Sequence, residues 1–410
     1  MKHSALVLLL CLTSVGTSYA AEFKLTPSLA ISEEYNDNVF DSAFDVKTDY
    51  ITHVMPGLAL KYKTLFWDWD ISYFLDYRYY ARNSFTNDHP SNLNAIGQIT
   101  LVDNLLFLDL SEVYQRVSTN IRQDFTEESL NTNQTQSNIV TASPYITLQP
   151  ASTVKTKIGG LFANYWYDDP NSIDKTEYGA FATLDYEVAQ NIFINTGYNF
   201  THSEARQDPQ FNNYNLHNMF VGPRYEYAEK SFLYGQGGYT FIDYASGQSF
   251  NNPFWNVGIN HNFDTYVATV ETRVDYEQDP EQNLTEVTSY TGKLEKIFSR
   301  GTVSLSLGYF QYKYLNDSTQ ADTDKYQAGI GAQYELLPRL TANLAFTAEE
   351  FHENGVGNYT RYYVNPILTY ALPRDFAVSL NYIFVDYTSD DIAENNRRIN
   401  RVILEVRKVF

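Results

Sequence analysis

The sequence contains very little cysteine. Its single cysteine, Cys11, lies in the apolar run 5–12, which precedes a small-x-small cleavage site at residues 18–20. This order is typical of a secretory leader, so residues 1–20 are predicted to be a signal peptide and residues 21–410 the mature chain. The mature chain is therefore expected to have neither a disulfide nor a reactive thiol.

Long apolar runs and basic charge are also scarce. Beyond the leader, no apolar stretch approaches the roughly 18 residues that a spanning helix needs, which argues against a helical inner-membrane protein. The sequence has 29 Lys and Arg residues and 49 Asp and Glu residues, which gives a net charge of −20. No nucleic-acid partner is therefore expected.

Motifs for catalysis or cofactor binding are missing too. The seven histidines are scattered without a pair at metal-ligand spacing. Neither a Gly-x-Ser-x-Gly elbow nor a glycine-rich phosphate loop occurs. The sequence therefore predicts no cofactor, no metal and no enzymatic activity.

Aromatic residues, in contrast, are abundant, with 35 tyrosines and 26 phenylalanines. In the stretch WDWDISYFLDYRYY, residues 67–80, rings and aliphatic side chains alternate with polar ones, so a strand would carry them on opposite faces. The polar face would hold Asp68, Asp70, Ser72, Asp76 and Arg78. Such a strand separates two different surroundings.

The same alternation recurs along the whole chain. The alternating segments run to about ten residues or more, which exceeds the usual 5 to 6 of soluble strands and matches the ~9 to 11 that a tilted transmembrane strand needs. Nine tight turns alternate with longer polar loops, which predicts ten hairpins. The turns lie at or near Thr64, Asn104, Ala151, Asn191, Lys230, Asp264, Arg300, Arg339 and Arg374.

These features predict an all-β fold: a single transmembrane antiparallel up-and-down β-barrel of about 20 strands, with 18 as the alternative. Short turns would face the periplasm and longer loops the outside of the cell. A large soluble β-sandwich or propeller is the competing interpretation. Strand length and the number of tyrosines, which membrane-interface girdles use naturally, favour the barrel.

The carboxyl terminus, RVILEVRKVF, alternates in the same way and ends on an aromatic residue, Phe410. It resembles the signature by which bacterial outer-membrane barrels are recognised for assembly, although Lys408 stands where that pattern prefers an apolar residue. Closure of the barrel would pair this strand with the first one, which contains Phe23 and Ile31. The expected partners are the barrel assembly machinery, outer-membrane lipid and lipopolysaccharide.

A second resemblance lies near the amino terminus. Residues 35–38 read Tyr-Asn-Asp-Asn, and a Pro-Gly pair follows at Pro56 and Gly57. These motifs resemble the opening of an outer-membrane β-barrel porin family that is associated with bacterial exopolysaccharide and protein-sorting gene clusters. The resemblance implies location in the bacterial outer membrane and an association with surface polysaccharide, and it implies no established reaction.

Two polar rows are the candidate lumen-facing residues, because barrels of this strand number enclose more volume than side chains can fill. Acidic residues exceed basic ones in them, which predicts mild cation preference. Two interpretations remain open for four polar-face aromatics, stacking on sugar rings or membership of the girdles: Phe74, Tyr80, Phe310 and Tyr312. The rows are Asp68, Asp70, Asp76 and Arg78, then Glu271, Arg273, Asp275 and Glu277.

The longest loop, residues 118–137, is a candidate for an inward-folded constriction, with a mobile external loop as the alternative. Three functions remain open. The leading one is a passive pore or export conduit linked to exopolysaccharide, the second a non-conducting barrel that binds or organises surface polysaccharide. A barrel hydrolase is the third, and its candidate cluster is Glu349, Glu350, His352 and Glu353.

Overall fold

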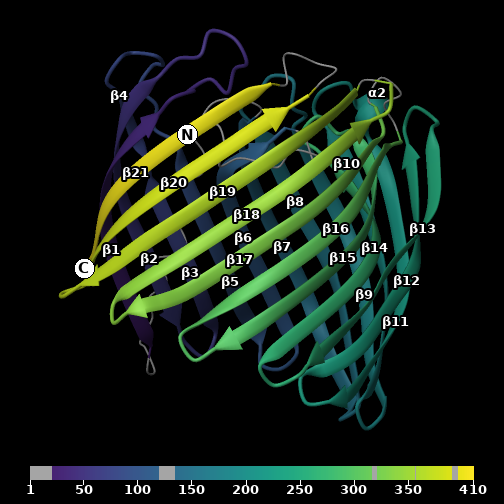
Figure 1. Ribbon diagram of the computed structural model, residues 1–410. Coiled ribbons are helices and arrows are strands. Elements are labelled where there is room, and N and C mark those ends of the chain that lie inside the picture. The colour runs from purple at the N-terminus through teal and green to yellow at the C-terminus, as the bar shows by residue number, and fades with distance from the viewer. Residues whose placement is uncertain (1–20, 120–133, 316–320, 356, 390–395) are drawn as a thin grey trace.

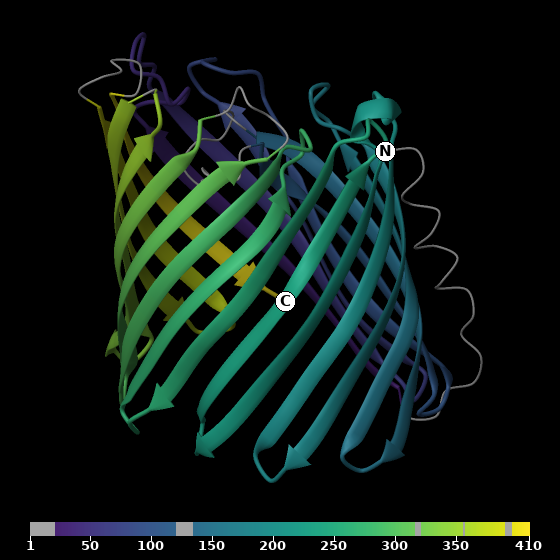
Figure 2. The same cartoon turned by 90° about the vertical axis from the view of Figure 1, so that its right-hand side faces the viewer.

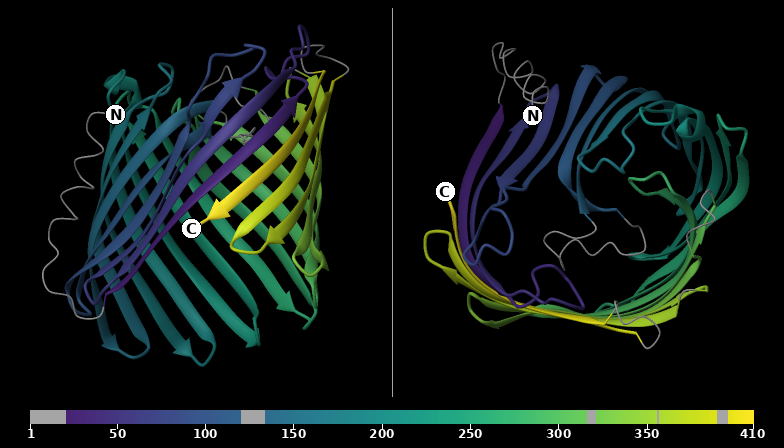
Figure 3. Two further views of the ribbon diagram at one scale, coloured as in Figure 1. Left: turned by 90° about the vertical axis from the view of Figure 1, so that its left-hand side faces the viewer. Right: turned by 90° about the horizontal axis from the view of Figure 1, so that it is seen from above.

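The computed structural model describes residues 21–119, 134–315, 321–355, 357–389 and 396–410. The predicted signal peptide, most of the predicted constriction loop and part of three other segments lie outside these residues. Within the described residues, the chain forms one closed antiparallel β-barrel of 20 strands, with 79% of its residues in strands. Strands tilt steeply around a ring that is open at its centre when seen from above (Figures 1 and 3).

The strands follow one another around the ring in sequence order (Figures 1 and 2). They are β1 (Glu22–Asn36), β2 (Asp49–Lys63), β3 (Trp67–Leu75), β4 (Tyr77–Tyr80), β5 (Ser91–Val102), β6 (Leu106–Ser118), β7 (Gln134–Ala151), β8 (Val154–Tyr167), β9 (Lys175–Ala189), β10 (Ile192–Ala205), β11 (Tyr214–Ala228), β12 (Ser231–Tyr244), β13 (Ser249–Asn262), β14 (Tyr266–Gln278), β15 (Leu284–Phe298), β16 (Gly301–Tyr314), β17 (Thr323–Leu337), β18 (Leu340–Glu353), β19 (Gly357–Leu372), β20 (Phe376–Thr388) and β21 (Arg397–Val409). A one-turn helix, α2 (Pro209–Asn212), interrupts one loop. Among the described residues, no helix has the length and apolar character needed to cross a membrane.

Two of the named strands, β3 and β4, are parts of one membrane strand. Both pair with β2 in a single continuous register, and only Asp76 separates them. The Asp76 amide donates a hydrogen bond of 2.8 Å to the carbonyl of Pro90 on the other side. Proline has no N–H to return that bond, so the ladder is interrupted at this point. The 21 segments therefore make 20 strands, as predicted.

The first and last strands close the barrel. Ile31 of β1 lies opposite Val406 of β21, and the pairing extends from Ser28 to Asn36. The Phe410 amide continues it with a hydrogen bond of 2.9 Å to the carbonyl of Pro27. The predicted closure is confirmed, and it leaves no free sheet edge between the two ends of the chain.

The tight turns lie where the sequence places them, one between each pair of strands at the end opposite the long loops. Several need a left-handed backbone, which Asn and Asp adopt more readily than most residues. Asn104, Asn191 and Asp264 have φ values of 56°, 65° and 63°. Local turn chemistry therefore predicted the hairpins correctly.

Candidate functional site

The two faces of the barrel wall differ in chemistry. On β1, Phe23, Leu25 and Ile31 are 63%, 47% and 48% exposed on one face. The opposite face of the same strand carries Ser32 and Glu34, which are buried. Residues paired across strands share a face, so the register carries this division around the ring. In an outer-membrane barrel the apolar face contacts lipid, and the polar face encloses the lumen.

The first predicted lumen row begins with Asp68 and Asp70 on the polar face of β3. They lie directly opposite Lys63 and Lys61 of β2. The Lys63 Nζ and Asp68 Oδ2 atoms are 2.7 Å apart, and the Lys61 Nζ and Asp70 Oδ2 atoms are 3.0 Å apart. All four side chains are more than half exposed, so water surrounds these ion pairs although they point into a closed ring.

The other two members of this row, Asp76 and Arg78, lie higher on the wall and are nearly buried. The Arg78 Nε atom donates a hydrogen bond of 2.6 Å to Asp76, and Asp76 contacts the His53 ring at 2.8 Å. His53 is 3.5 Å from Glu34, which binds the Arg401 guanidinium. The network ties β4, β2, β1 and β21 together along the polar face, and it crosses the seam of the barrel.

The second predicted row lies on the polar face of β14. The Tyr234 hydroxyl donates a short hydrogen bond to Glu271. The Arg273 guanidinium is 3.8 Å from Asp275 and 3.5 Å from Glu277. The structure thus places all eight candidates on the polar face, in two separate arcs. That they touch a permeating solute stays a prediction.

These pairings change the electrostatic argument for ion preference. The sequence argument counted acids along single strands, whereas the register places lysines opposite two of them. A paired carboxylate attracts a mobile cation less, because its neighbour repels that cation at nearly the same distance. Cation preference remains a prediction, and its expected size is small.

The polar-face aromatics Phe74, Tyr80, Phe310 and Tyr312 do not act as one group. Tyr80 is fully buried against Val39 and Ile51, and Tyr312 is also buried. The Lys325 Nζ atom lies 4.6 Å from the centre of the Phe310 ring. Phe74 is 47% exposed. Of these four residues, only Phe74 presents a free ring to the lumen, so the expectation that all four could stack on sugars is wrong for the two buried tyrosines.

Loops narrow the barrel at the end where the long loops lie, which we call the mouth. In the loop between β1 and β2, Val39 is buried and Asp41 binds Arg397 of β21 with Nε and Oδ1 atoms 2.7 Å apart. Burial raises the pKa of Asp41, although the Arg397 charge acts in the opposite direction. This loop packs against the inside of the ring, as the view from above shows (Figure 3).

A second contact joins two loops that are distant in sequence. The Ile173 amide, in the loop between β8 and β9, donates a hydrogen bond of 2.8 Å to the carbonyl of Pro280, in the loop between β14 and β15. Asp279 beside it is buried, and burial raises its pKa to about 6. Asn283 donates backbone and side-chain hydrogen bonds to Asp279 at 2.8 and 2.9 Å. The mouth is therefore narrowed from two sides.

The predicted hydrolase cluster does not assemble. Glu349 lies on the polar face, where the Arg361 Nη1 atom is 2.6 Å from its carboxylate. Glu350 and His352 lie on the apolar face, 2.9 Å apart. The barrel wall separates these groups, because adjacent residues of a strand point to opposite faces. Among the described residues, no cluster of three or more His, Cys, Asp or Glu side chains could hold a metal ion.

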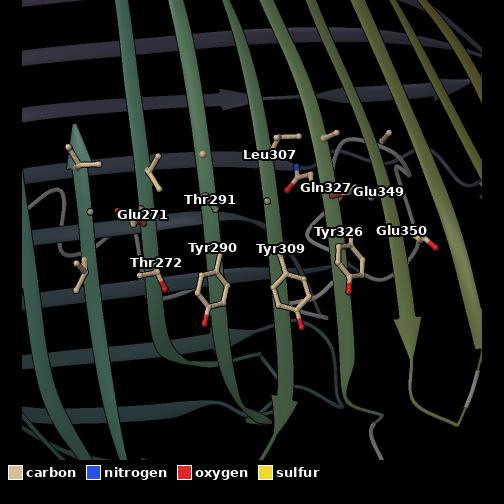
Figure 4. Close-up of a pocket in the computed structure, with 18 of the residues that line it drawn as sticks. Glu271, Thr272, Tyr290, Thr291, Leu307, Tyr309, Tyr326, Gln327, Glu349 and Glu350 are labelled. Carbon is tan, nitrogen blue, oxygen red and sulfur yellow. The ribbon is translucent and has the colours of Figure 1, made fainter. Parts of the chain in front are cut away.

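A cavity of about 1000 Å³ lies on the outer, apolar face and not in the lumen. Tyr290, Tyr309 and Tyr326 form a row along one end of it on three neighbouring strands, as Figure 4 shows. The centres of the Tyr309 and Tyr326 rings are 5.1 Å apart. Glycine and alanine residues, among them Gly292 and Ala328, line the cavity beside the rings. The row is an aromatic girdle of the kind that the tyrosine content predicts.

A second cavity, of about 520 Å³, lies in the wall formed by β8 to β14. The sequence argument named Arg273 and Asp275 of its polar-face lining and missed the rest. Its aromatic members are Phe181, Phe220 and Phe254, and amides lie among them. Each of these rings lies opposite a glycine of the neighbouring strand, and such glycines are visible in the sequence. They indicate the site only when the pairing of residues between strands is known.

Comparisons with known proteins support the fold. No protein-family model matches this sequence, and no curated protein matches it. The FrpB iron transporter from Neisseria meningitidis superimposes with a TM-score of 0.54 at 10% identity, over 94% of this chain and 82% of that one. The siderophore receptor PirA from Pseudomonas aeruginosa gives 0.56 at 8% identity, over 96% and 82%.

At these identities the likeness shows the architecture alone. It confirms the barrel part of the resemblance that the amino-terminal motifs indicated. The association with exopolysaccharide gene clusters stays a prediction. The chain is a closed antiparallel β-barrel of 20 strands, with the architecture of these outer-membrane transporters.

Proposed function

We propose that this protein is a passive pore of the outer membrane for polar solutes. The observation that carries the proposal is the exposure of the ion pairs inside the ring. Lys61 and Asp70 are 65% and 58% exposed, although their strands belong to a closed barrel whose other face is apolar. A lumen filled by side chains would bury them, and burying charges is costly. A water-filled lumen accounts for the exposure.

The finer part of the proposal is that the pore serves as a conduit for surface polysaccharide. It is supported by the resemblance of residues 35–38, Pro56 and Gly57 to a porin family associated with exopolysaccharide clusters. Among the described residues, the loop contacts that cross the ring lie at the mouth, and a lumen that is open below them suits an extended polymer better than a folded one.

A second candidate is a non-conducting barrel that binds or organises surface polysaccharide. The packing of loops at the mouth favours it, since Val39 is buried inside the ring and Ile173 bonds to Pro280 across two loops. Either function would place the protein among outer-membrane lipid and lipopolysaccharide after insertion by the barrel assembly machinery.

Single-channel conductance in a planar bilayer separates the two candidates. We expect stable open steps from the refolded protein, whose folding is checked by heat-modifiable gel migration. Folded protein that leaves the bilayer silent at every voltage would contradict the pore and favour the polymer-binding barrel. A double alanine variant of Val39 and Asp41 removes a buried side chain and the ion pair with Arg397, so it loosens the loop between β1 and β2 and should conduct more than the native protein.

A further inference from the structure

We propose that one arc of the lumen wall binds neutral oligosaccharides. The arc is defined by six polar-face side chains of β9 to β13, which we call the amide track: Phe181, Phe220, Phe254, Asn199, Gln236 and Asn256. The inference rests on the proposed pore, because an open lumen gives the ligand access, and it names the class of solute.

The tips of the three rings lie over glycines of the neighbouring strands. A Cβ atom on Gly197 would lie 2.7 Å from the Phe220 ring, and one on Gly238 would lie 2.4 Å from the Phe254 ring. A Cβ on Gly159 would lie 2.7 Å from the Phe181 ring. Any larger residue would push the ring away from the wall. Each ring therefore occupies space that a glycine leaves free, and each remains partly exposed on the polar face.

The rings repeat on alternate strands, β9, β11 and β13. Phe220 and Phe254 occupy one row of the register with Gly238 between them. Strands lie about 4.8 Å apart, so rings on alternate strands are about 10 Å apart across the wall. Because the strands tilt by roughly 35–45°, a row across them climbs along the lumen. A linear chain of sugar rings fits this arrangement.

The amides supply hydrogen-bonding groups that no protein group uses. Within the described part of the chain, Asn199, Gln236 and Asn256 make no side-chain hydrogen bond, and the Asn256 Oδ1 atom is buried without a partner. Some other lumen amides are paired, as Gln98 is with Asp109 at 2.9 Å. An amide both donates and accepts, which matches the two roles of a sugar hydroxyl.

The charge of the track selects for a neutral ligand. Among the described residues that line the cavity, Arg273 and Asp275 are the only charged ones, and their side chains are 3.8 Å apart, so their charges offset each other. An anionic or cationic polymer would lose hydration without gaining an unpaired counter-charge. Aromatic faces together with unpaired amides, and no net charge, are what a neutral sugar requires.

The test is block of the single-channel current by maltohexaose and cellohexaose, compared with the anionic polymer polygalacturonate. We expect at least one neutral hexasaccharide to block the native pore more strongly than polygalacturonate. The variants F220A and F254A should each weaken that block about three- to tenfold. Block that is strongest with polygalacturonate would overturn the neutral assignment.

Two matched controls lie on the other side of the ring. Phe74 on β3 is an exposed polar-face phenylalanine, and Asn94 on β5 is an exposed polar-face amide. F74A and N94L should leave the block unchanged, whereas N256L should weaken it. Equal effects of F74A and F220A on the block would refute binding at the amide track, because any aromatic ring in the lumen would then contribute equally to the block.

Calorimetric titration of the detergent-folded protein with the same hexasaccharides separates failure of the track from failure of the pore. Binding that F220A weakens, in a protein that does not conduct, would refute the pore and retain the track. Conductance with neither block nor calorimetric binding would retain the pore and refute the track.

Discussion

Arg401 of the last strand holds Glu34 of the first strand through two hydrogen bonds, of 2.8 and 2.9 Å, across the seam where the barrel closes. Both side chains are almost completely buried. The two residues lie near opposite ends of the sequence. They make contact only because the first and last strands pair.

Breaking this pair should destabilise the barrel. The variant R401M leaves the Glu34 carboxylate buried with His53 as its remaining basic neighbour, and loss of one partner of a buried pair costs about 3–5 kcal/mol. The measurement is the urea midpoint for loss of the folded band in gel migration. The exposed pair of Asp68 and Lys63 is the control, since D68N should cost less than about 1 kcal/mol. A cost for R401M no larger than that of D68N would count against a structural role of the seam.

The loop between β14 and β15 should loosen as pH rises. Burial raises the pKa of Asp279 to about 6, above its ordinary value of 3.8. The folded loop therefore favours the protonated carboxyl, and its stability falls as pH rises between those two values, up to about 6. A nitroxide label at the exposed position of Glu281, as E281C, should be more mobile at pH 7.5 than at pH 4. In D279N the mobility should not change with pH. If the mobility of the label does not depend on pH in the protein that retains Asp279, the prediction is wrong.

Removing the lysines opposite the acidic row should increase cation preference. The double variant K61Q/K63Q leaves Asp70 and Asp68 unpaired and exposed. Reversal potentials under a salt gradient should show roughly a doubling of the cation-to-anion permeability ratio. The reciprocal variant D68N/D70N should shift the ratio toward anions. If neither variant moves the reversal potential, the ion pairs do not line the conducting path.

Phe410 should matter for assembly more than for stability. Its ring is 69% exposed, and the contact it makes with Lys408 is a distance of 5.6 Å between Nζ and the ring centre. F410S should therefore change the urea midpoint of the refolded barrel by no more than about 0.5 kcal/mol. In cells it should strongly lower the amount of folded protein in the outer membrane. A large loss of stability in the purified variant would assign the residue a packing role instead.

The sequence predicted the fold because its determinants are local. Alternation with period two, strands of membrane length and turn residues such as Asn104 and Asp264 each depend on a few neighbouring residues. These features allowed the strand number, the closure and the polar faces of both candidate rows to be predicted. The interruption at Asp76 was not predicted, since it depends on Pro90 in another segment.

The candidate site was harder to predict from the sequence, because contacts between residues of different strands determine which groups it contains. Register placed Lys61 opposite Asp70 and glycines beneath Phe220 and Phe254, and loop packing buried Tyr80. The wall also separated Glu349 from Glu350, although they are adjacent in the chain. The sequence by itself thus determined a 20-strand β-barrel with one apolar and one polar face, since both follow from local periodicity. Only the tertiary structure decided which charges are neutralised and which rings and amides remain free, because those properties depend on partners from distant strands.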